Sequence, residues 1–163
     1  MVVIPRQVEY AVMALGDMSA AQPGEVFAAR ALCETHGTPF DVMSRTLQRL
    51  HRAGMLRAVR GVSGGYQLIQ RVDELSLLDL FDAVSGRLSA AQCTNGPGSA
   101  RKCRMHAVCK VSGSMKTLDV RIRQLYRAVR LSDLFGAKAE GAGKRSRRRA
   151  KRAKEEVFNA GGS

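Results

Sequence analysis

Apolar residues in the first third of the chain recur every three or four positions, the spacing of one face of an α-helix. The first stripe predicts a helix over residues 5–20 and consists of Val8, Ala11, Val12, Leu15 and Met18. A second stripe predicts a helix over residues 26–36 that Gly37 ends. Thr38 is the expected N-cap of a third helix, with Pro39 as its first residue. Two helices joined by a tight glycine turn are the outline of a helix-turn-helix.

Two short strand-like stretches follow the third helix. Residues 56–59 and 66–69 are separated by a glycine-rich turn over 60–65, which predicts a β-hairpin. A hairpin directly after a helix-turn-helix is the wing of a winged helix. Ser76 and Asp79 then form a capping box that opens another helix. The expected fold class is therefore mainly α with a small β-hairpin wing, a winged helix-turn-helix with a long dimerisation helix behind it.

The last periodic stretch has the spacing of a heptad seam. Its apolar residues step by four and three in alternation and are Val111, Met115, Leu118, Ile122, Leu125 and Val129. The polar face of the same helix is expected to carry Lys116, Asp119, Arg121, Arg123 and Arg127. We interpret the seam as a homodimer interface. The alternative is a long core helix that packs against its own domain.

These patterns divide the chain into five parts. In order, they are a winged helix-turn-helix DNA-binding domain (1–72), a connecting helix (73–90), a cysteine-bearing loop (91–109), a dimerisation helix (110–135) and a basic tail expected to be disordered (136–163). The tail either holds DNA backbone or is simply solvated.

The charge of the chain points to a phosphate-bearing partner. There are 27 Lys and Arg against 14 Asp and Glu, a net charge of +13. Residues 137–163 hold 9 basic and 3 acidic residues, so residues 1–136 keep a net +7 without them. Such an excess favours nucleic acid or anionic lipid. No run of 18 apolar residues is present, so no membrane span is expected. Of the two phosphate-bearing partners nucleic acid is preferred, and no membrane partner is expected. No secretory signal is recognisable, and a cytoplasmic location is expected.

Double-stranded DNA is the favoured partner because the third helix carries base-reading residue types in its first turns. Arg45 can pair bidentately with guanine, Gln48 with adenine, and Ser44 with either. Arg60 begins the wing, where it can enter a narrow minor groove. The full set of candidate DNA-binding residues is Asp41, Ser44, Arg45, Gln48, Arg49 and Arg60. Arg52 and Arg57 are expected to serve phosphates.

Three of the four cysteines cluster in one loop, at Cys93, Cys103 and Cys109. Three thiolates suit soft metals, either zinc or the iron of an iron–sulfur cluster. No CxxC pair is present, which disfavours zinc. Cys33 lies on the inner stripe of a helix and is expected to be a core residue. Three free thiols or a Cys103–Cys109 disulfide are the remaining alternatives.

Three ligands leave a fourth position open. From the residues alone it could be filled by His106, Cys33 or Glu9. Arg101, Lys102, Arg104 and Lys110 flank the thiols and would offset the negative charge of a cluster.

The helix-to-wing stretch resembles a known family. Leu50-His51-Arg52-Ala53-Gly54-Met55-Leu56, followed by Arg60-Gly61-Val62-Ser63-Gly64-Gly65-Tyr66, is similar to the signature of the IscR/NsrR/RirA regulators. The resemblance covers about residues 4–133 and includes the cysteine trio. It implies a bacterial winged-helix homodimer that senses iron, nitric oxide or redox state through an iron–sulfur cluster and dimerises through a long helix.

The resemblance is strongest to the NsrR-like members, in which a carboxylate of the first helix is the fourth ligand and reaches the cluster of the other subunit. Glu9 occupies that place in this chain. The IscR-like members use a His shortly after the last cysteine, and none follows Cys109 here. The resemblance therefore implies Cys93, Cys103, Cys109 and Glu9 as ligands of a 4Fe–4S cluster, with 2Fe–2S as the other possibility.

The expected function is a homodimeric DNA-binding transcription regulator, a repressor, whose cluster gates operator binding. A zinc-bound or metal-free thiol regulator and an iron–sulfur accessory protein are the alternatives. An enzyme is not expected, because no Ser/His/Asp set, P-loop or dinucleotide fingerprint is present.

Overall fold

The computed structural model describes residues 4–105 and 107–136. The elements begin with α1 (Arg6–Ala20), α2 (Ala29–His36), α3 (Phe40–Arg52), β1 (Leu56–Val59) and β2 (Gly65–Leu68). They continue with α4 (Leu77–Ser85), a 3₁₀ turn η1 (Gln92–Thr94), α5 (Ser99–Lys102), α6 (Ser112–Ala128) and α7 (Leu131–Gly136). This is a mainly helical winged helix with one two-stranded antiparallel hairpin, as the sequence predicts. The expected tail lies almost wholly outside the described residues.

The helix-turn-helix packs around the stripe of α1. Val8, Ala11 and Leu15 are fully buried against Met43 and Leu47 of α3 in one core cluster. Gly37 ends α2 in the left-handed conformation, at φ +63°, as expected of a glycine C-cap.

The start of the third helix differs from the sequence prediction. Pro39 has an extended ψ of 131° and occupies the N-cap position, so the first helical residue is Phe40. Thr38 thus lies one position too early to cap the helix, and its buried hydroxyl has no hydrogen-bond partner within the described residues. The prediction of Thr38 as the N-cap was wrong for this reason.

The second helix begins three residues later than expected because residues 26–28 are extended and pair with β2. Phe27 pairs with Tyr66 of β2: the Phe27 amide donates to the Tyr66 carbonyl at 2.8 Å, and the Tyr66 amide donates to the Phe27 carbonyl at 2.9 Å. This pairing fixes the wing to the segment that leads into α2. Gly65 makes it possible, because a Cβ there would lie 2.3 Å from the Phe27 carbonyl oxygen.

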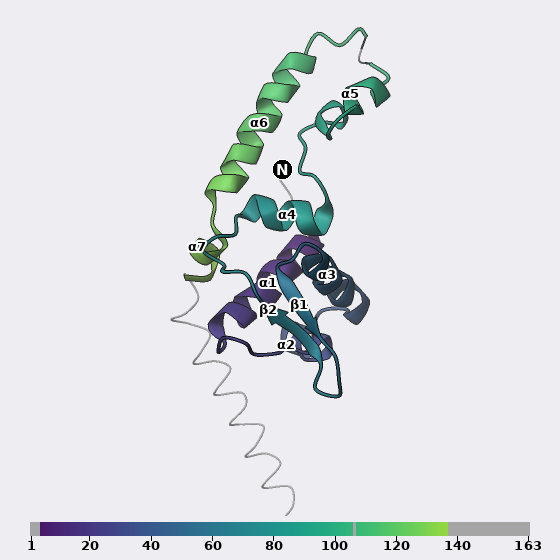
Figure 1. The fold of residues 1–163 in the computed structure, drawn as a ribbon. Coiled ribbons are helices and arrows are strands. Elements are labelled where there is room, and N and C mark those ends of the chain that lie inside the picture. Colours follow the sequence, from purple (N-terminus) through teal and green to yellow (C-terminus); the bar gives the residue numbers. More distant parts are fainter. Residues whose placement is uncertain (1–3, 106, 137–163) are drawn as a thin grey trace, which may run out of the picture.

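The helix α4 lies between the winged helix and α6 (Figure 1). The predicted capping box is confirmed: Ser76 accepts from the Asp79 amide, and Asp79 accepts from the Ser76 amide at 3.0 Å. Leu75 and Leu80 on either side of it are both buried. The core thus continues past residue 72 into α4. The division into two parts at residue 72 stays a prediction.

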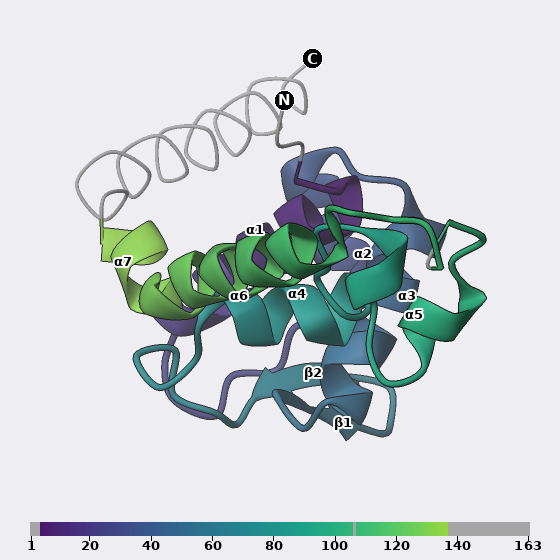
Figure 2. The same ribbon diagram turned by 90° about the horizontal axis from the view of Figure 1, so that it is seen from above.

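The segment expected as one dimerisation helix contains two helices. Between α6 and α7, the chain is extended and pairs with the start of α4: the Leu77 amide donates to Val129 and the Leu131 amide to Leu75, both at 2.9 Å. Leu131 is fully buried in the core. Viewed from above, α6 lies across α4, on the side away from β1 and β2 (Figure 2).

Candidate nucleic-acid interface and cysteine segment

The exposed side of α3 carries three of the predicted base-reading residues. Asp41, Arg45 and Gln48 are spaced by four and three, so they share one face, and all three are exposed. Ser44 lies at the edge of this face and is half-buried. The opposite face holds Met43, Leu47 and Leu50, which are fully buried. The core therefore turns the polar face of α3 outward.

The wing presents Arg60 at the point where β1 ends. Its side chain is exposed and is followed by Gly61, at φ +119°. Gly64 closes the turn by donating its amide to the Gly61 carbonyl at 3.0 Å. A Cβ at Gly64 would lie 2.5 Å from the Val59 carbonyl oxygen, so the turn needs glycine at this position.

Arg49 is placed differently from the other candidates. Its guanidinium donates to the Gln7 side chain of α1 at 2.6 Å and to the Val84 carbonyl at the end of α4. A DNA contact by Arg49 stays a prediction, but this side chain also links three helices. Of the two expected phosphate contacts, Arg52 is exposed and Arg57 bonds Gln67 on the neighbouring strand.

Replacement of Arg60 by alanine is expected to weaken binding to the preferred DNA by about tenfold and to reduce preference for A·T-rich flanks. The guanidinium would otherwise sit in the negative potential of a narrow minor groove. The measurement is fluorescence anisotropy with the duplex that the full-length protein selects from random-sequence DNA. Arg71→Ala is the matched control, because Arg71 is exposed but pairs with Asp73 at 2.6 Å, outside the wing. Equal losses for both variants would contradict a role of Arg60 in the groove.

The cysteine segment, residues 91–109, joins the winged helix to α6. Cys93 lies in η1, Cys103 directly follows α5, and Cys109 precedes α6. These three thiols are free and half-buried. Cys33 is buried in the core cluster, as the sequence predicts. Glu9 lies in the first turn of α1, half-buried. The segment thus holds three thiols between the winged helix and the seam helix.

The described residues of this single chain do not assemble a cluster or metal site. Across residues 4–105 and 107–136, no three His, Cys, Asp or Glu side chains lie together in a way that could hold a metal ion. The structure therefore does not bring Cys93, Cys103, Cys109 and Glu9 into one group. The donor set still fits an iron–sulfur cluster in kind, because thiolates are the ligands such clusters require. The flanking cations Arg101, Lys102, Arg104 and Lys110 are all exposed.

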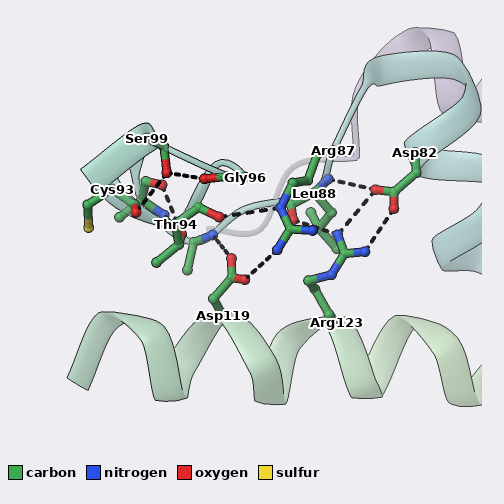
Figure 3. A network of polar contacts seen from close by, with 11 residues as sticks. Asp82, Arg87, Leu88, Cys93, Thr94, Gly96, Ser99, Asp119 and Arg123 are labelled. Atoms are coloured by element: carbon green, nitrogen blue, oxygen red, sulfur yellow. Dashed lines mark hydrogen bonds and ion pairs between the residues drawn. The ribbon is translucent and has the colours of Figure 1, made fainter. Parts of the chain in front are cut away.

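A polar network that the sequence did not reveal connects this segment to α4 and α6 (Figure 3). Asp119, whose side chain is 6% exposed, accepts from the Ala90 amide at 2.8 Å and pairs with Arg87 at 3.4 Å. Arg123 bonds Asp82 at 2.9 Å. That bond raises the pKa of Arg123, against the effect of burial. The polar face expected of this helix is therefore not uniformly exposed, since Asp119 and Arg123 both face inward.

The seam of α6 lies on a different side of the helix. Leu118 is 42% exposed and Leu125 is 64% exposed, while Met115 and Ile122 are half-buried. Tyr126, on the side that faces α4, is buried edge-on against Phe81 at a centroid distance of 5.9 Å. Packing among the described residues thus leaves Val111, Leu118 and Leu125 of the seam exposed and the other three seam residues half-buried.

None of the helices in the described part of the chain combines the length and apolarity needed to cross a membrane.

Comparison with solved structures confirms the fold. The structure of IscR from T. potens superimposes with a TM-score of 0.60 at 17% identity, covering 86% of this chain and 91% of that one. The global cysteine regulator CymR of B. subtilis superimposes with a TM-score of 0.62 at 15% identity, covering 85% and 99%.

Sequence relatives indicate the functional class. An HTH-type transcriptional regulator of Neisseria meningitidis serogroup A is 28% identical over 137 residues, which is 83% of this chain and 89% of that protein. The HTH-type transcriptional regulator IscR of Aliivibrio salmonicida is 29% identical over 127 residues, 77% and 73% of the two chains. Residues 4–137 match the Rrf2 family, described as an iron-dependent transcriptional regulator. With its winged helix as the DNA-binding unit, the chain belongs to the Rrf2 family and is a transcriptional regulator, not an enzyme.

Proposed function

We propose that this regulator is a homodimer that binds an operator through α3 and the wing, and that an iron–sulfur cluster held by the cysteine segment gates the binding. The observation that carries the proposal is the position of the three free thiols. They occupy the segment that connects α4, which packs against the winged helix, to α6 and its exposed seam residues. A change at the thiols is therefore well placed to alter how two DNA-binding units are held.

Cys93, Cys103 and Cys109 would supply three thiolates, and Glu9 of the partner subunit the fourth ligand. A cluster of this kind would supply reactivity toward nitric oxide, oxygen or iron depletion. A 4Fe–4S cluster is favoured over 2Fe–2S because of the carboxylate ligand that the resemblance to NsrR-like members implies. The exposed cations around the thiols support the proposal, since they offset the negative charge of a thiolate-rich group.

Glu9 would link the two halves of the dimer. It belongs to α1, which packs against both α3 and α4. Ligation by the partner's Glu9 would tie the winged helix of one subunit to the cysteine segment of the other. A carboxylate is a hard donor among soft thiolates, so this bond would be the weakest of the four and the first to be lost. Its loss would free α1 without unfolding the domain.

Operator binding by two copies is supported by the seam. Dimeric helix-turn-helix proteins place their recognition helices in half-sites about 34 Å apart, one turn of DNA. Holding two winged helices at that spacing requires a firm contact between the copies. The exposed apolar side chains of α6 would form this contact, and the chain after α6 is anchored to the core by the buried Leu131 of α7.

Single replacements test the ligand set. Cys93→Ser, Cys103→Ser and Cys109→Ser are each expected to abolish cluster retention, and Glu9→Ala to make the cluster labile while the dimer persists. The measurement is iron and sulfide content with native mass spectrometry after anaerobic purification. Cys33→Ser is the control, since that thiol lies in the core, and it should keep the cluster. Bleaching of the Cys33 variant alone, with Cys103→Ser retaining iron, would contradict the assignment.

A metal-free thiol regulator is the second candidate. It is favoured by the fact that the described residues of one chain do not gather three ligands into a group. This candidate predicts anaerobically purified protein without iron or sulfide that still changes its DNA affinity when its thiols are oxidised. Iron and inorganic sulfide present in stoichiometric amounts would exclude it.

A further inference from the structure

The last turn of α4 supports two parts of the molecule that are far apart in the sequence. On one side, the carboxylate of Asp82 binds Arg123 of α6 through both oxygens, at 2.9 and 3.3 Å, and accepts the Leu88 amide at 2.7 Å. On the other side, the carbonyl of Val84 accepts from Arg49 of the recognition helix α3. Asp82 and Val84 are only two residues apart, so a displacement of one is transmitted to the other within a single helical turn.

The contacts on the Asp82 side lead without interruption into the cysteine segment (Figure 3). Arg123 also donates to the Leu88 carbonyl at 2.9 Å, while Asp119 accepts from Ala90 at 2.8 Å. Arg87 pairs with Asp119 and donates to the carbonyl of Thr94, the neighbour of Cys93. The backbone between α4 and Cys93 is thus held along its length by two residues of α6.

The backbone on the C-terminal side of Cys93 is also hydrogen-bonded. Its carbonyl accepts from the Ser99 hydroxyl at 2.9 Å, and the same hydroxyl bonds the Gly96 carbonyl at 2.7 Å. A rearrangement of η1 would disturb its neighbours, because Ser99 joins it to α5 and Arg87, which binds the Thr94 carbonyl, joins it to Asp119. A buried carboxylate such as Asp119 is costly to leave unpaired, so its partners must move with it.

We infer that the last turn of α4 is a junction that couples the position of the cysteine segment to that of the recognition helix α3. Asp82, Arg123 and Arg49 are then positioning residues for DNA recognition. None of them needs to touch a base. Arg123 fixes α6 and the residues before Cys93 to Asp82, and Arg49 fixes α3 to Val84 and to Gln7 of α1. The same turn of α4 thereby fixes the orientation of α3 and the position of the cysteine segment.

The test replaces Arg123 by methionine, which keeps most of the length of the side chain and removes its bonds to Asp82 and Leu88. Arg121→Met is the matched control. Arg121 lies on the same helix, is exposed, and makes no hydrogen bond or ion pair among the residues that the structure describes. Arg123→Lys keeps the charge with a single point donor and should restore part of the effect.

Hydrogen exchange of the full-length protein gives the first readout. Arg123→Met is expected to speed amide exchange in the last turn of α4 and in α3, while α2 exchanges as in the wild type. Unchanged exchange in α3 would overturn the junction, whatever the cysteines bind. Equal acceleration throughout the winged helix would also overturn it, because that pattern reports general destabilisation.

The second readout rests on the proposed function and compares DNA affinity in two thiol states, as purified without oxygen and after exposure to air. Arg123→Met is expected to reduce the ratio of the two affinities at least fivefold, with Arg121→Met unchanged. A wild-type ratio of one would refute gating by the thiols and leave the junction to be decided by hydrogen exchange. If the two thiol states of the wild type differ in DNA affinity and Arg123→Met shows the same ratio, the junction is overturned while the proposed gating by the thiols stands.

Discussion

Replacing Leu118 with lysine is expected to dissociate the dimer and, with it, to remove high-affinity operator binding. Leu118 lies in the middle of the α6 seam and is 42% exposed in the single chain. A second copy packed on the seam would bury two new ammonium groups, one from each subunit, without a carboxylate partner. The dimer dissociation constant should rise by at least about a hundredfold, since unpaired buried charges cost several kcal/mol.

Lysine is chosen because it adds positive charge. A monomer carrying Leu118→Lys should keep or gain non-specific affinity for DNA, so a loss of operator binding must come from dissociation. Val120→Lys is the matched control: Val120 is also exposed, at 53%, but lies about 200° around the helix from Leu118. Sedimentation equilibrium measures the assembly, and anisotropy with the selected duplex measures binding. A Leu118→Lys protein that remains a dimer would show that the seam is not the interface.

Gly65→Ala is expected to lower the free energy of unfolding by about 2–4 kcal/mol, because the added methyl group has no room. Its Cβ would lie 2.3 Å from the carbonyl oxygen of Phe27 and 2.7 Å from the carbonyl carbon. The two backbone hydrogen bonds between Phe27 and Tyr66 must then lengthen or break. The wing would separate from the segment before α2, and specific DNA binding should fall with it.

Gly113→Ala is the control of opposite sign. Gly113 lies in the first turn of α6, and a Cβ there meets no atom within 4 Å. Alanine has the higher helix propensity, so this variant should gain up to about 1 kcal/mol. Both are measured by urea unfolding at one fixed protein concentration, because a dimer's stability depends on concentration. Wild-type stability of Gly65→Ala would mean that the wing does not need the close approach to Phe27.

The repeating features of the sequence predicted most of the fold. The stripes of α1 and α6, the capping box at Ser76 and the glycine at Gly37 act within one or two helical turns, so a local pattern is sufficient to predict them. The errors arose where a distant partner decided the conformation. Residues 26–28 are extended because Tyr66, forty residues away, offers them hydrogen bonds. The motif Ser76-x-x-Asp79 contains both partners of its capping box, whereas Thr38 lies one residue before the N-cap and has no hydrogen-bond partner among the described residues.

The candidate site divides in the same way. Exposure of Arg45, Gln48 and Arg60 follows from the helical and hairpin patterns that surround them. The inward orientation of Asp119 and Arg123 does not, because their partners Arg87 and Asp82 lie on another helix and a loop. One signal was available: Asp119 and Arg123 are four residues apart, the spacing of two side chains on one helix face. That spacing is equally typical of a solvated face, so it could not distinguish the two.

The buried position of Leu131 has a consequence for how the protein is made. The core around α1 and α4 is closed by a residue 56 positions beyond Leu75, with which it shares a backbone hydrogen bond. At about 5–20 residues per second, a ribosome needs roughly 3–11 s to synthesise that interval. During this time the nascent winged helix has all of its base-reading residues but an open core. The exposed apolar surface is then a site for chaperones, and a chain released before Leu131 should be degraded instead of competing for operator DNA.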